Sequence, residues 1–183
     1  MIKRIASFII GLTVFVNSGI SYAALPRTGV TFSQVQCEYL DLAWETVYRK
    51  TLDAGCDVVR LGAYWSRIER ESGVYDFSEL DRQIDMAEDR GIDVILTVGM
   101  KAPRWPEYFI PEWVRRRLGV IRGSDVTQDP YLRGRVRRFI RDVVKRYRDR
   151  QAVLCWQVEN EPLNHAGPDD WYIGERFLRQ EIE

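Results

Sequence analysis

Short apolar runs alternate along the chain with segments whose apolar residues recur at every third or fourth position. The short runs are typical of strands that are covered on both faces, and they span residues 29–36, 57–63, 92–99 and 152–159. The periodic segments predict amphipathic helices over residues 40–54, 78–90, 129–147 and 168–183. A long loop is expected between residues 100 and 128. The pattern therefore predicts four β-α pairs in succession.

Residues that favour helix ends support two of these helices. Asp129 is a typical N-cap residue, and Pro130 follows it at the first helical position. Ser78 and Asp81 resemble a capping box, and Gly91 is suited to the end of the same helix. The third helix carries a long apolar stripe, which consists of Leu132, Val136, Phe139, Ile140, Val143 and Tyr147.

A strict alternation of strands and helices predicts a parallel sheet with right-handed crossovers. An open doubly wound sheet and a (β/α)₈ barrel both fit this order. No glycine-rich phosphate loop follows a strand, which weakens the nucleotide-binding version of the open sheet. A complete barrel needs about 250 residues. We therefore expect an α/β chain that forms the N-terminal half of a (β/α)₈ TIM barrel, with four βα units.

The first 23 residues resemble a secretory signal peptide. Lys3 and Arg4 precede an apolar run over residues 5–16, and Ser21-Tyr22-Ala23 is a small-x-small cleavage site. The apolar run is shorter than the roughly 20 residues that a membrane span requires. Cleavage after Ala23 would leave residues 24–183 as a partial barrel domain of four βα units. We expect a secreted or periplasmic protein without stable membrane insertion after cleavage.

Composition and charge narrow the class of partner. Hydrophobic residues make up 45% of the chain and charged residues 30%, which is typical of a globular domain. Lys+Arg and Asp+Glu both number 27, and this balance argues against a nucleic-acid partner. Cys37, Cys56 and Cys155 lie beside apolar segments and are predicted as small core residues rather than as a disulfide. No metal site is expected, because neither the three cysteines nor the single histidine has the spacing of metal ligands. No cofactor is expected either.

The end of the fourth predicted strand carries the strongest candidate chemistry. Residues 156–162 read Trp-Gln-Val-Glu-Asn-Glu-Pro, and Pro162 cannot continue a strand ladder. In a barrel, this strand end would lie at the catalytic face. Glu161 is there the candidate general acid, and Asn160 could hydrogen-bond a substrate hydroxyl. On position alone, exposed acids after a strand fit the sequence equally well.

Four further side chains are candidates for substrate binding. Arg60 lies in the apolar second strand and should need a carboxylate partner. Trp65 and Trp105 follow strand ends and could stack on sugar rings, although core packing is the commoner fate of tryptophan. Trp156 is predicted as a core residue. His165 could either reach the substrate or be an ordinary loop residue.

The strand-four heptapeptide resembles that of the large barrel clan of retaining glycosidases, which includes family 5 cellulases and family 42 β-galactosidases. Further segments resemble the clan in the same order, and these are residues 64–69, 73–81, 91–96 and 102–105. The similarity covers residues 29–178. It implies that Glu161 is the acid/base, that Asn160 contacts the sugar 2-hydroxyl and that Arg60 supports the nucleophile. Pro162 departs from family 42, whose members usually lack it, and matches family 5.

The resemblance implies hydrolysis of β-linked oligo- or polysaccharides by a retaining mechanism. Such enzymes need a second carboxylate as nucleophile, about 5–5.5 Å from the first. In this clan it follows strand seven, which the four predicted strands do not include. Glu159 is an unsuitable substitute, since it shares a strand with Glu161 and is expected to face the barrel interior lower down. We therefore expect the parent protein to be active and this chain alone to be inactive.

Two other functions remain compatible with these residues. One is a non-catalytic carbohydrate-binding protein on a degenerate barrel, for which no downstream nucleophile would be needed. The other is a transglycosylase, which would use the same residues and transfer the sugar to an acceptor. In each case the partner is a carbohydrate. An unrelated barrel or doubly wound enzyme is disfavoured by the residues at the end of strand four.

Overall fold

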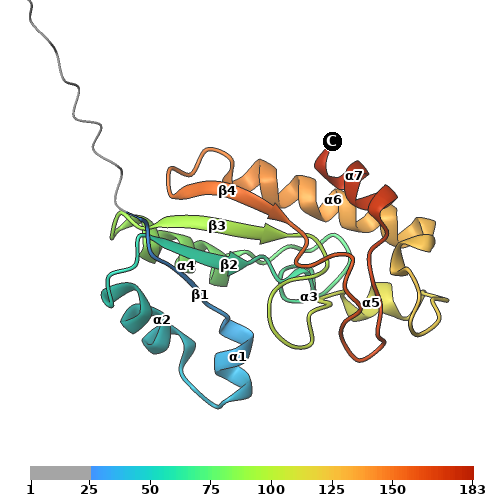
Figure 1. Ribbon diagram of the computed structural model, residues 1–183, viewed down its shortest axis with the longest axis horizontal. Helices are drawn as coiled ribbons and strands as arrows, with labels where there is room; N and C mark the ends of the chain where they lie inside the picture. The colour runs from blue at the N-terminus through green and yellow to red at the C-terminus, as the bar shows by residue number, and fades with distance from the viewer. Residues whose placement is uncertain (1–25) are drawn as a thin grey trace, which may run out of the picture.

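The computed structural model describes residues 26–183, so the signal peptide predicted over residues 1–23 lies outside the described residues. Four parallel strands form one sheet in the order β1-β2-β3-β4 (Figure 1). Their bounds are Gly29–Thr31 for β1, Val58–Gly62 for β2, Asp93–Val98 for β3 and Val153–Val158 for β4. The predicted parallel sheet is confirmed.

Helices and loops surround this sheet. The helices are α1 (Gln34–Tyr39), α2 (Trp44–Asp53), α3 (Trp65–Ile68), α4 (Ser78–Glu88), α5 (Glu112–Arg115), α6 (Pro130–Tyr147) and α7 (Glu175–Ile182), with a 3₁₀ turn over Val126–Gln128. Helices α6 and α7 lie beside β4, and α1 and α2 lie on the side of β1 (Figure 1). The strands all point toward the loops that contain α3 and α5. No helix among residues 26–183 is long and apolar enough to cross a membrane.

Helix α6 has the ends and the buried face that its sequence predicts. The Asp129 carboxylate accepts hydrogen bonds from the N–H groups of Tyr131 and Leu132, at 2.8 and 3.0 Å. Pro130 stands at the first helical position, where its missing N–H costs nothing. All six residues of the predicted stripe are buried. Burial of this stripe fixes the helix against the sheet, because apolar area removed from water stabilises the fold.

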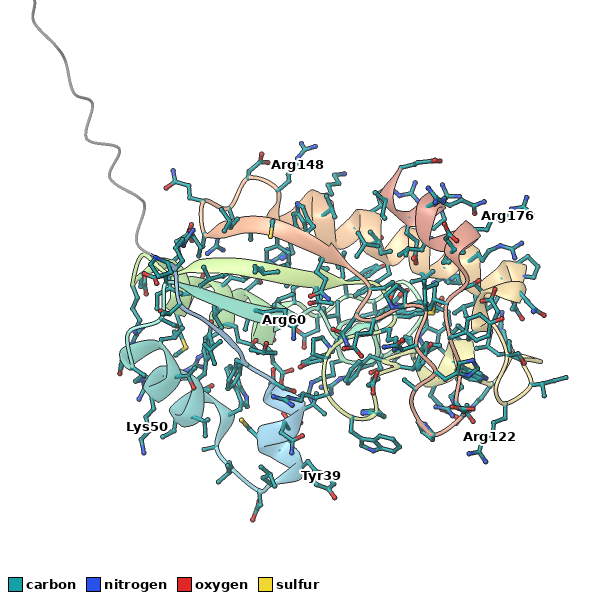
Figure 2. The ribbon with its side chains drawn as sticks, viewed as in Figure 1. Tyr39, Lys50, Arg60, Arg122, Arg148 and Arg176 are labelled. Carbon is teal, nitrogen blue, oxygen red and sulfur yellow. The ribbon has the colours of Figure 1, made fainter. Side chains whose placement is uncertain are left out.

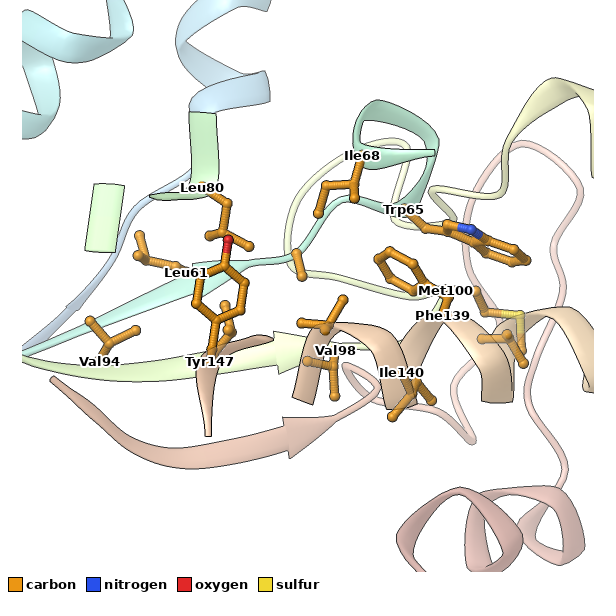
Figure 3. Close-up of a cluster of buried hydrophobic side chains, with 14 of the residues drawn as sticks. Leu61, Trp65, Ile68, Leu80, Val94, Val98, Met100, Phe139, Ile140 and Tyr147 are labelled. Carbon is orange, nitrogen blue, oxygen red and sulfur yellow. The ribbon is translucent and has the colours of Figure 1, made fainter. Parts of the chain in front are cut away.

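The core lies between the strands and this layer of helices. Val98 of β3 lies near Ile140 of α6, whereas Val94 lies toward the Tyr147 end of that helix (Figure 3). Trp65 packs its ring against Phe139 at 5.5 Å between centroids. Both rings are fully buried. The contact joins the segment after β2 to α6, so the core also shapes the loops at the carboxyl ends of the strands.

The first predicted strand is too long, and a helix was missed. The strand ends at Thr31, since the Ser33 hydroxyl accepts a hydrogen bond from the Gln36 N–H at 3.2 Å and caps α1. The helix predicted over 40–54 accordingly begins at Trp44. A local capping bond therefore overrides the apolar pattern of this segment.

Two further predictions about helix ends are wrong. Phe77 is the N-cap of α4 and makes no side-chain cap bond, and the Ser78 N–H donates to the Asp76 carboxylate at 3.0 Å. The last helix begins at Glu175 rather than near residue 168, because Ala166 and Trp171 pair in a tight turn before it. Both helix starts depend on local hydrogen bonds of side chains and backbone, which the pattern of apolar residues does not reveal.

The cysteines are free, but only one is buried. Cys37 is buried in α1, Cys56 is partly buried, and Cys155 is exposed on β4. The prediction of a core position is therefore wrong for Cys155. Side chains alternate along a strand, and the neighbouring Trp156 packs against the core, so Cys155 lies on the opposite, open face of the sheet.

Candidate functional site

A pocket of about 580 Å³ lies at the carboxyl ends of the strands. Four of the six predicted site residues line it, and these are Arg60, Trp105, Asn160 and Glu161. They come from β2, the loop after β3 and the tip of β4. Parallel strands bring their carboxyl ends to the same edge of a sheet, which explains how distant segments meet here.

The tip of β4 turns sharply to present Glu161. Glu159 and Glu161 both adopt left-handed backbone conformations, with φ of 58° and 48°. The intervening Asn160 N–H donates to the Lys101 carbonyl at 2.9 Å, which ties the tip to the loop after β3. Residues other than glycine adopt positive φ rarely, and such strain is concentrated at functional sites. The turn leaves the Glu161 side chain exposed at the pocket wall.

A fully buried lysine holds this turn from below. Lys101 Nζ donates to the carbonyl oxygens of Glu161 and Asn164, at 2.7 and 2.9 Å. Its third neighbour is the Glu107 carboxylate, with Nζ 3.6 Å from Oε2. Burial lowers the pKa of Lys101, and the carboxylates of Glu107 and Glu161 oppose that shift. The lysine thus acts as a clamp on the backbone that carries Glu161.

Glu159 does not face the open interior, which corrects the sequence-based expectation. Its carboxylate is buried and accepts hydrogen bonds from the N–H groups of Met100 and Lys101, at 2.9 and 2.6 Å. The space it occupies exists because residue 99 is glycine, since a Cβ there would collide with the carboxylate. Burial raises the pKa of Glu159, which also lies beside Glu181 of α7. Glu159 therefore joins β3, β4 and α7 instead of serving the pocket.

A chain of polar side chains forms the floor of the pocket. The Arg60 guanidinium donates to Thr31 Oγ1 at 3.1 Å and to Gln157 Oε1 at 3.2 Å (Arg60 is labelled in Figure 2). The Thr97 hydroxyl also donates to Gln157 Oε1, at 3.1 Å, and Gln157 Nε2 donates to Asn160 Oδ1 at 3.3 Å. Arg60 was expected to have a carboxylate partner, and within the described chain its partners are instead a hydroxyl and an amide.

Trp65 and His165 are not in the pocket wall. Trp65 is fully buried, and its Nε1 donates to the Glu69 carboxylate at 2.7 Å, so the predicted stacking role is wrong. His165 is half exposed, with Nδ1 2.9 Å from the Asp170 carbonyl oxygen. The centroid of its ring lies 4.8 Å from that of Tyr172. These local contacts favour the interpretation of His165 as an ordinary loop residue. The predicted core residue Trp156 is partly buried and packs against the core.

The pocket also contains residues that the sequence did not single out. Gln36, Arg104 and Glu107 line its wall, and Gln157 forms its floor. Gln157 directly follows Trp156, whose ring packs against the core, so strand alternation could have placed it on the opposite, interior face. Gln36 could not have been found in this way, because the helix that carries it was itself missed.

The arrangement suits an uncharged polyhydroxylated ligand. Amide and guanidinium groups on the floor can bind hydroxyl groups, and the exposed Trp105 ring can cover an apolar face. Glu161 can transfer a proton to or from a ligand oxygen. Among residues 26–183, no group of three or more His, Cys, Asp or Glu side chains is placed to hold a metal ion.

Comparison with known sequences identifies the family. The sequence model of glycoside hydrolase family 42, described as beta-galactosidase, matches residues 38–177. A beta-galactosidase of Geobacillus sp. is 32% identical over 123 residues, which cover 62% of this chain and 18% of that protein. A beta-galactosidase of Haloferax lucentense is 30% identical over 132 residues, covering 64% and 19%. The chain thus spans about a fifth of the length of these relatives.

Solved structures agree on the fold. The beta-galactosidase from Rahnella sp. R3 superposes with a TM-score of 0.59 at 24% identity, over 74% of this chain and 21% of that one. A family 5 protein from Streptomyces cattleya, crystallised with GlcNAc, gives 0.61 at 23% identity over 86% and 39%. The four-stranded sheet corresponds to the N-terminal part of a TIM barrel. The match of the family model over residues 38–177 assigns this chain to glycoside hydrolase family 42, and the fold agrees with it.

Proposed function

We propose that the protein carrying this chain hydrolyses the O-glycosidic bonds of β-galactosides, with Glu161 as general acid/base. The observation that carries the proposal is the shared pocket, in which Glu161 and Asn160 lie at the β4 tip beside Arg60 and Trp105. The relatives named above are beta-galactosidases, which supports the choice of sugar.

The proposed reaction is a double displacement with retention. Glu161 donates its proton to the departing glycosidic oxygen while a second carboxylate attacks the anomeric carbon and forms a glycosyl-enzyme. Glu161 then takes a proton from water, which attacks the same carbon and releases the second carboxylate. The amides of Asn160 and Gln157 and the Arg60 guanidinium orient the sugar hydroxyls during both steps.

The second carboxylate is proposed to come from outside the four described strands. Glu107 is the other carboxylate in the pocket wall, but its Oε2 is buried close to Lys101 Nζ. An ion pair of this kind makes a poor nucleophile, because attack would leave the buried lysine without its counter-charge. We therefore propose that residues 24–183, expressed alone, do not turn over aryl β-galactosides.

The decisive experiment is Glu161→Gln in the protein that carries this chain. For β-galactosides with alkyl leaving groups, kcat/KM should fall about 10²- to 10⁴-fold, because these groups depend on general-acid assistance. The loss should be much smaller for dinitrophenyl β-galactoside, whose leaving group needs little protonation. Azide should then restore turnover and yield β-galactosyl azide.

Glu112→Gln is the matched control for that experiment. Glu112 is an exposed carboxylate of α5 that pairs with Arg116, the residue that follows this helix. This variant should retain wild-type kinetics with every substrate. Equal losses for the alkyl and dinitrophenyl substrates in Glu161→Gln would exclude the acid/base role.

We also propose that the protein is exported, on the basis of the signal-like sequence of residues 1–23. The mature protein should begin at Ala24. Amino-terminal sequencing of the protein recovered outside the cytoplasm would test this, and an intact Met1 would contradict it.

A further inference from the structure

A second, smaller hollow adjoins the pocket. It has a volume of about 240 Å³ and is lined by Gln36, Tyr39 and Trp105. Gln36 and Trp105 also line the larger pocket that contains Glu161. The two spaces share these walls and therefore lie side by side, and together they are called the cleft.

The hollow is bounded by two unusually exposed aromatic rings. Tyr39 is 78% exposed and Trp105 is 60% exposed. The other large apolar side chains exposed to a similar degree within residues 26–183 are aliphatic, so both exposed aromatics gather at this one place. Figure 2 shows Tyr39 on the outer side of α1. Aromatic rings left in water next to a polar pocket are typical of a surface that binds a ligand.

Local structure fixes the positions of both rings. Gln36 and Tyr39 are three residues apart on α1, which places them on the same side of the helix. Trp105 lies in a tight turn closed by two backbone hydrogen bonds, from Glu107 N–H to Arg104 O at 2.8 Å and from Ala102 N–H to Glu107 O at 2.9 Å. The hollow is thus largely preformed, which lowers the entropic cost of binding.

We infer that this hollow is a subsite for a sugar residue on the leaving-group side of the scissile bond. The inference rests on the proposed function. Depth distinguishes the two ends of the cleft, because Asn160 on the floor is 8% exposed whereas Tyr39 and Trp105 form the outer rim. A galactosyl unit held on the floor places its scissile bond beside Glu161 and its leaving group toward the rim.

The side chains that line the hollow indicate which kind of ligand can bind there. A pyranose presents C–H groups to an aromatic face and hydroxyl groups at its edge. The rings of Tyr39 and Trp105 offer the faces, and the Gln36 amide, which lines the same hollow, offers a donor and an acceptor. The natural substrates are therefore β-galactosyl oligosaccharides rather than galactosides with small aglycones.

The test compares substrates with and without a leaving-group sugar. For the protein that carries this chain, kcat/KM is measured with β-galactosyl fluoride and with β-1,3-, β-1,4- and β-1,6-galactosyl disaccharides. Tyr39→Ala should lower the disaccharide-to-fluoride ratio of kcat/KM about tenfold for the preferred linkage, mainly through KM. Tyr39→Phe should keep the ratio near that of the wild type, because it retains the ring.

Leu40→Ala is the matched control, since Leu40 is an exposed neighbour of Tyr39 that does not line the hollow. It should leave the ratio unchanged. A ratio that also stays unchanged in Tyr39→Ala would overturn the subsite while leaving the proposed function intact. Wild-type protein that fails to hydrolyse the fluoride would instead overturn the proposed function.

Discussion

Lys101 is the residue whose loss should most disturb the β4 tip. Lys101→Met would leave the carbonyls of Glu161 and Asn164 without their donor and Glu107 without its counter-charge. Breaking a buried charged cluster in this way should lower the free energy of unfolding by about 3 kcal/mol. In the protein that carries this chain, kcat should fall more than KM rises, because Glu161 would be misplaced.

Urea unfolding and the pH profile of kcat would check this expectation. Lys50→Met is the matched control, since Lys50 is an exposed lysine of α2 (Figure 2). A variant that loses stability but keeps the wild-type kcat and pH profile would show that Lys101 has no role in positioning Glu161.

At the residue scale, the sequence predicted where chemistry gathers but not which side chains turn inward. Arg60 was singled out as a charge within an apolar strand. Position alone left Glu161 and Asn160 undecided, and they were identified because their heptapeptide resembles that of retaining glycosidases. Trp65 was misassigned because an apolar ring beside a strand end can face either the core or the solvent. Lys101 drew no attention, since its role depends on two carbonyl groups some 60 positions away.

At the element scale, Glu69 links three segments. Its carboxylate accepts hydrogen bonds from Trp65 Nε1 at 2.7 Å, the Gly73 N–H at 2.8 Å and Arg135 of α6 at 3.0 Å. Glu69→Ala would leave the buried Trp65 N–H without its acceptor and the partly buried Arg135 without its counter-charge, which should cost about 3 to 4 kcal/mol of unfolding free energy. Glu71→Ala removes an exposed carboxylate two positions away and should be nearly neutral. Equal unfolding midpoints in urea for the two variants would contradict this role.

The contact between β4 and α7 should depend on pH. Burial raises the pKa of Glu159, and burial together with the Glu159 charge raises the pKa of Glu181. Folded protein then holds more protons than unfolded protein above pH 4.5, so the stability that the pair contributes at low pH is lost as pH rises through the folded pKa values. Both Glu181 oxygens lack a hydrogen-bond partner in the described chain, as expected if the pair needs a shared proton.

Glu181→Gln should reduce this pH dependence. The loss of unfolding free energy between pH 5 and pH 8 should become about 2 kcal/mol smaller than in the wild type. The measurement is urea unfolding at the two pH values. Glu175→Gln, on the exposed side of the same helix, should behave like the wild type. If Glu181→Gln and the wild type lose the same free energy, the pair does not titrate in this range.

Helix boundaries mark the limit of sequence-based prediction at this scale. The apolar stripe of α6 was recognised correctly, because its period and its Asp129-Pro130 start agree. Helix α1 was hidden within an apolar segment, and a single hydroxyl of Ser33 decides where the strand ends. A capping hydrogen bond from one hydroxyl group does not change the pattern of apolar positions, so that pattern cannot predict it.

At the scale of the whole molecule, β1 and β4 each pair on one side only within the described residues. A hollow of about 800 Å³ beside β4 is lined by apolar side chains, among them Val98, Trp156 and Val158, and by charged ones, among them Arg137 and Arg141. We expect residues 24–183, expressed alone, to self-associate through the β4 edge. Analytical ultracentrifugation should reveal species larger than a monomer.

Leu154→Lys should weaken that association, because it places a charge on the β4 edge where Leu154 is 52% exposed. Leu163→Lys, in a loop and similarly exposed at 57%, is the matched control and should have little effect. A monodisperse wild-type monomer that melts cooperatively would contradict the expectation. The parallel order of the sheet itself was predictable, since strict β-α alternation permits few other topologies.

The hydrogen bonds on the pocket floor fix the orientation of the Gln157 and Asn160 side-chain amides. Both acceptor positions of Gln157 Oε1 are taken by Arg60 and Thr97, so its amide cannot turn, and its N–H₂ must point to Asn160 Oδ1. Asn160 is thereby oriented as well, with its own N–H₂ left to meet the ligand. The ligand must therefore present a hydrogen-bond acceptor to the Asn160 N–H₂. A sugar hydroxyl can accept this bond, whereas a sugar with hydrogen or an ammonium group at that position cannot and should bind more weakly.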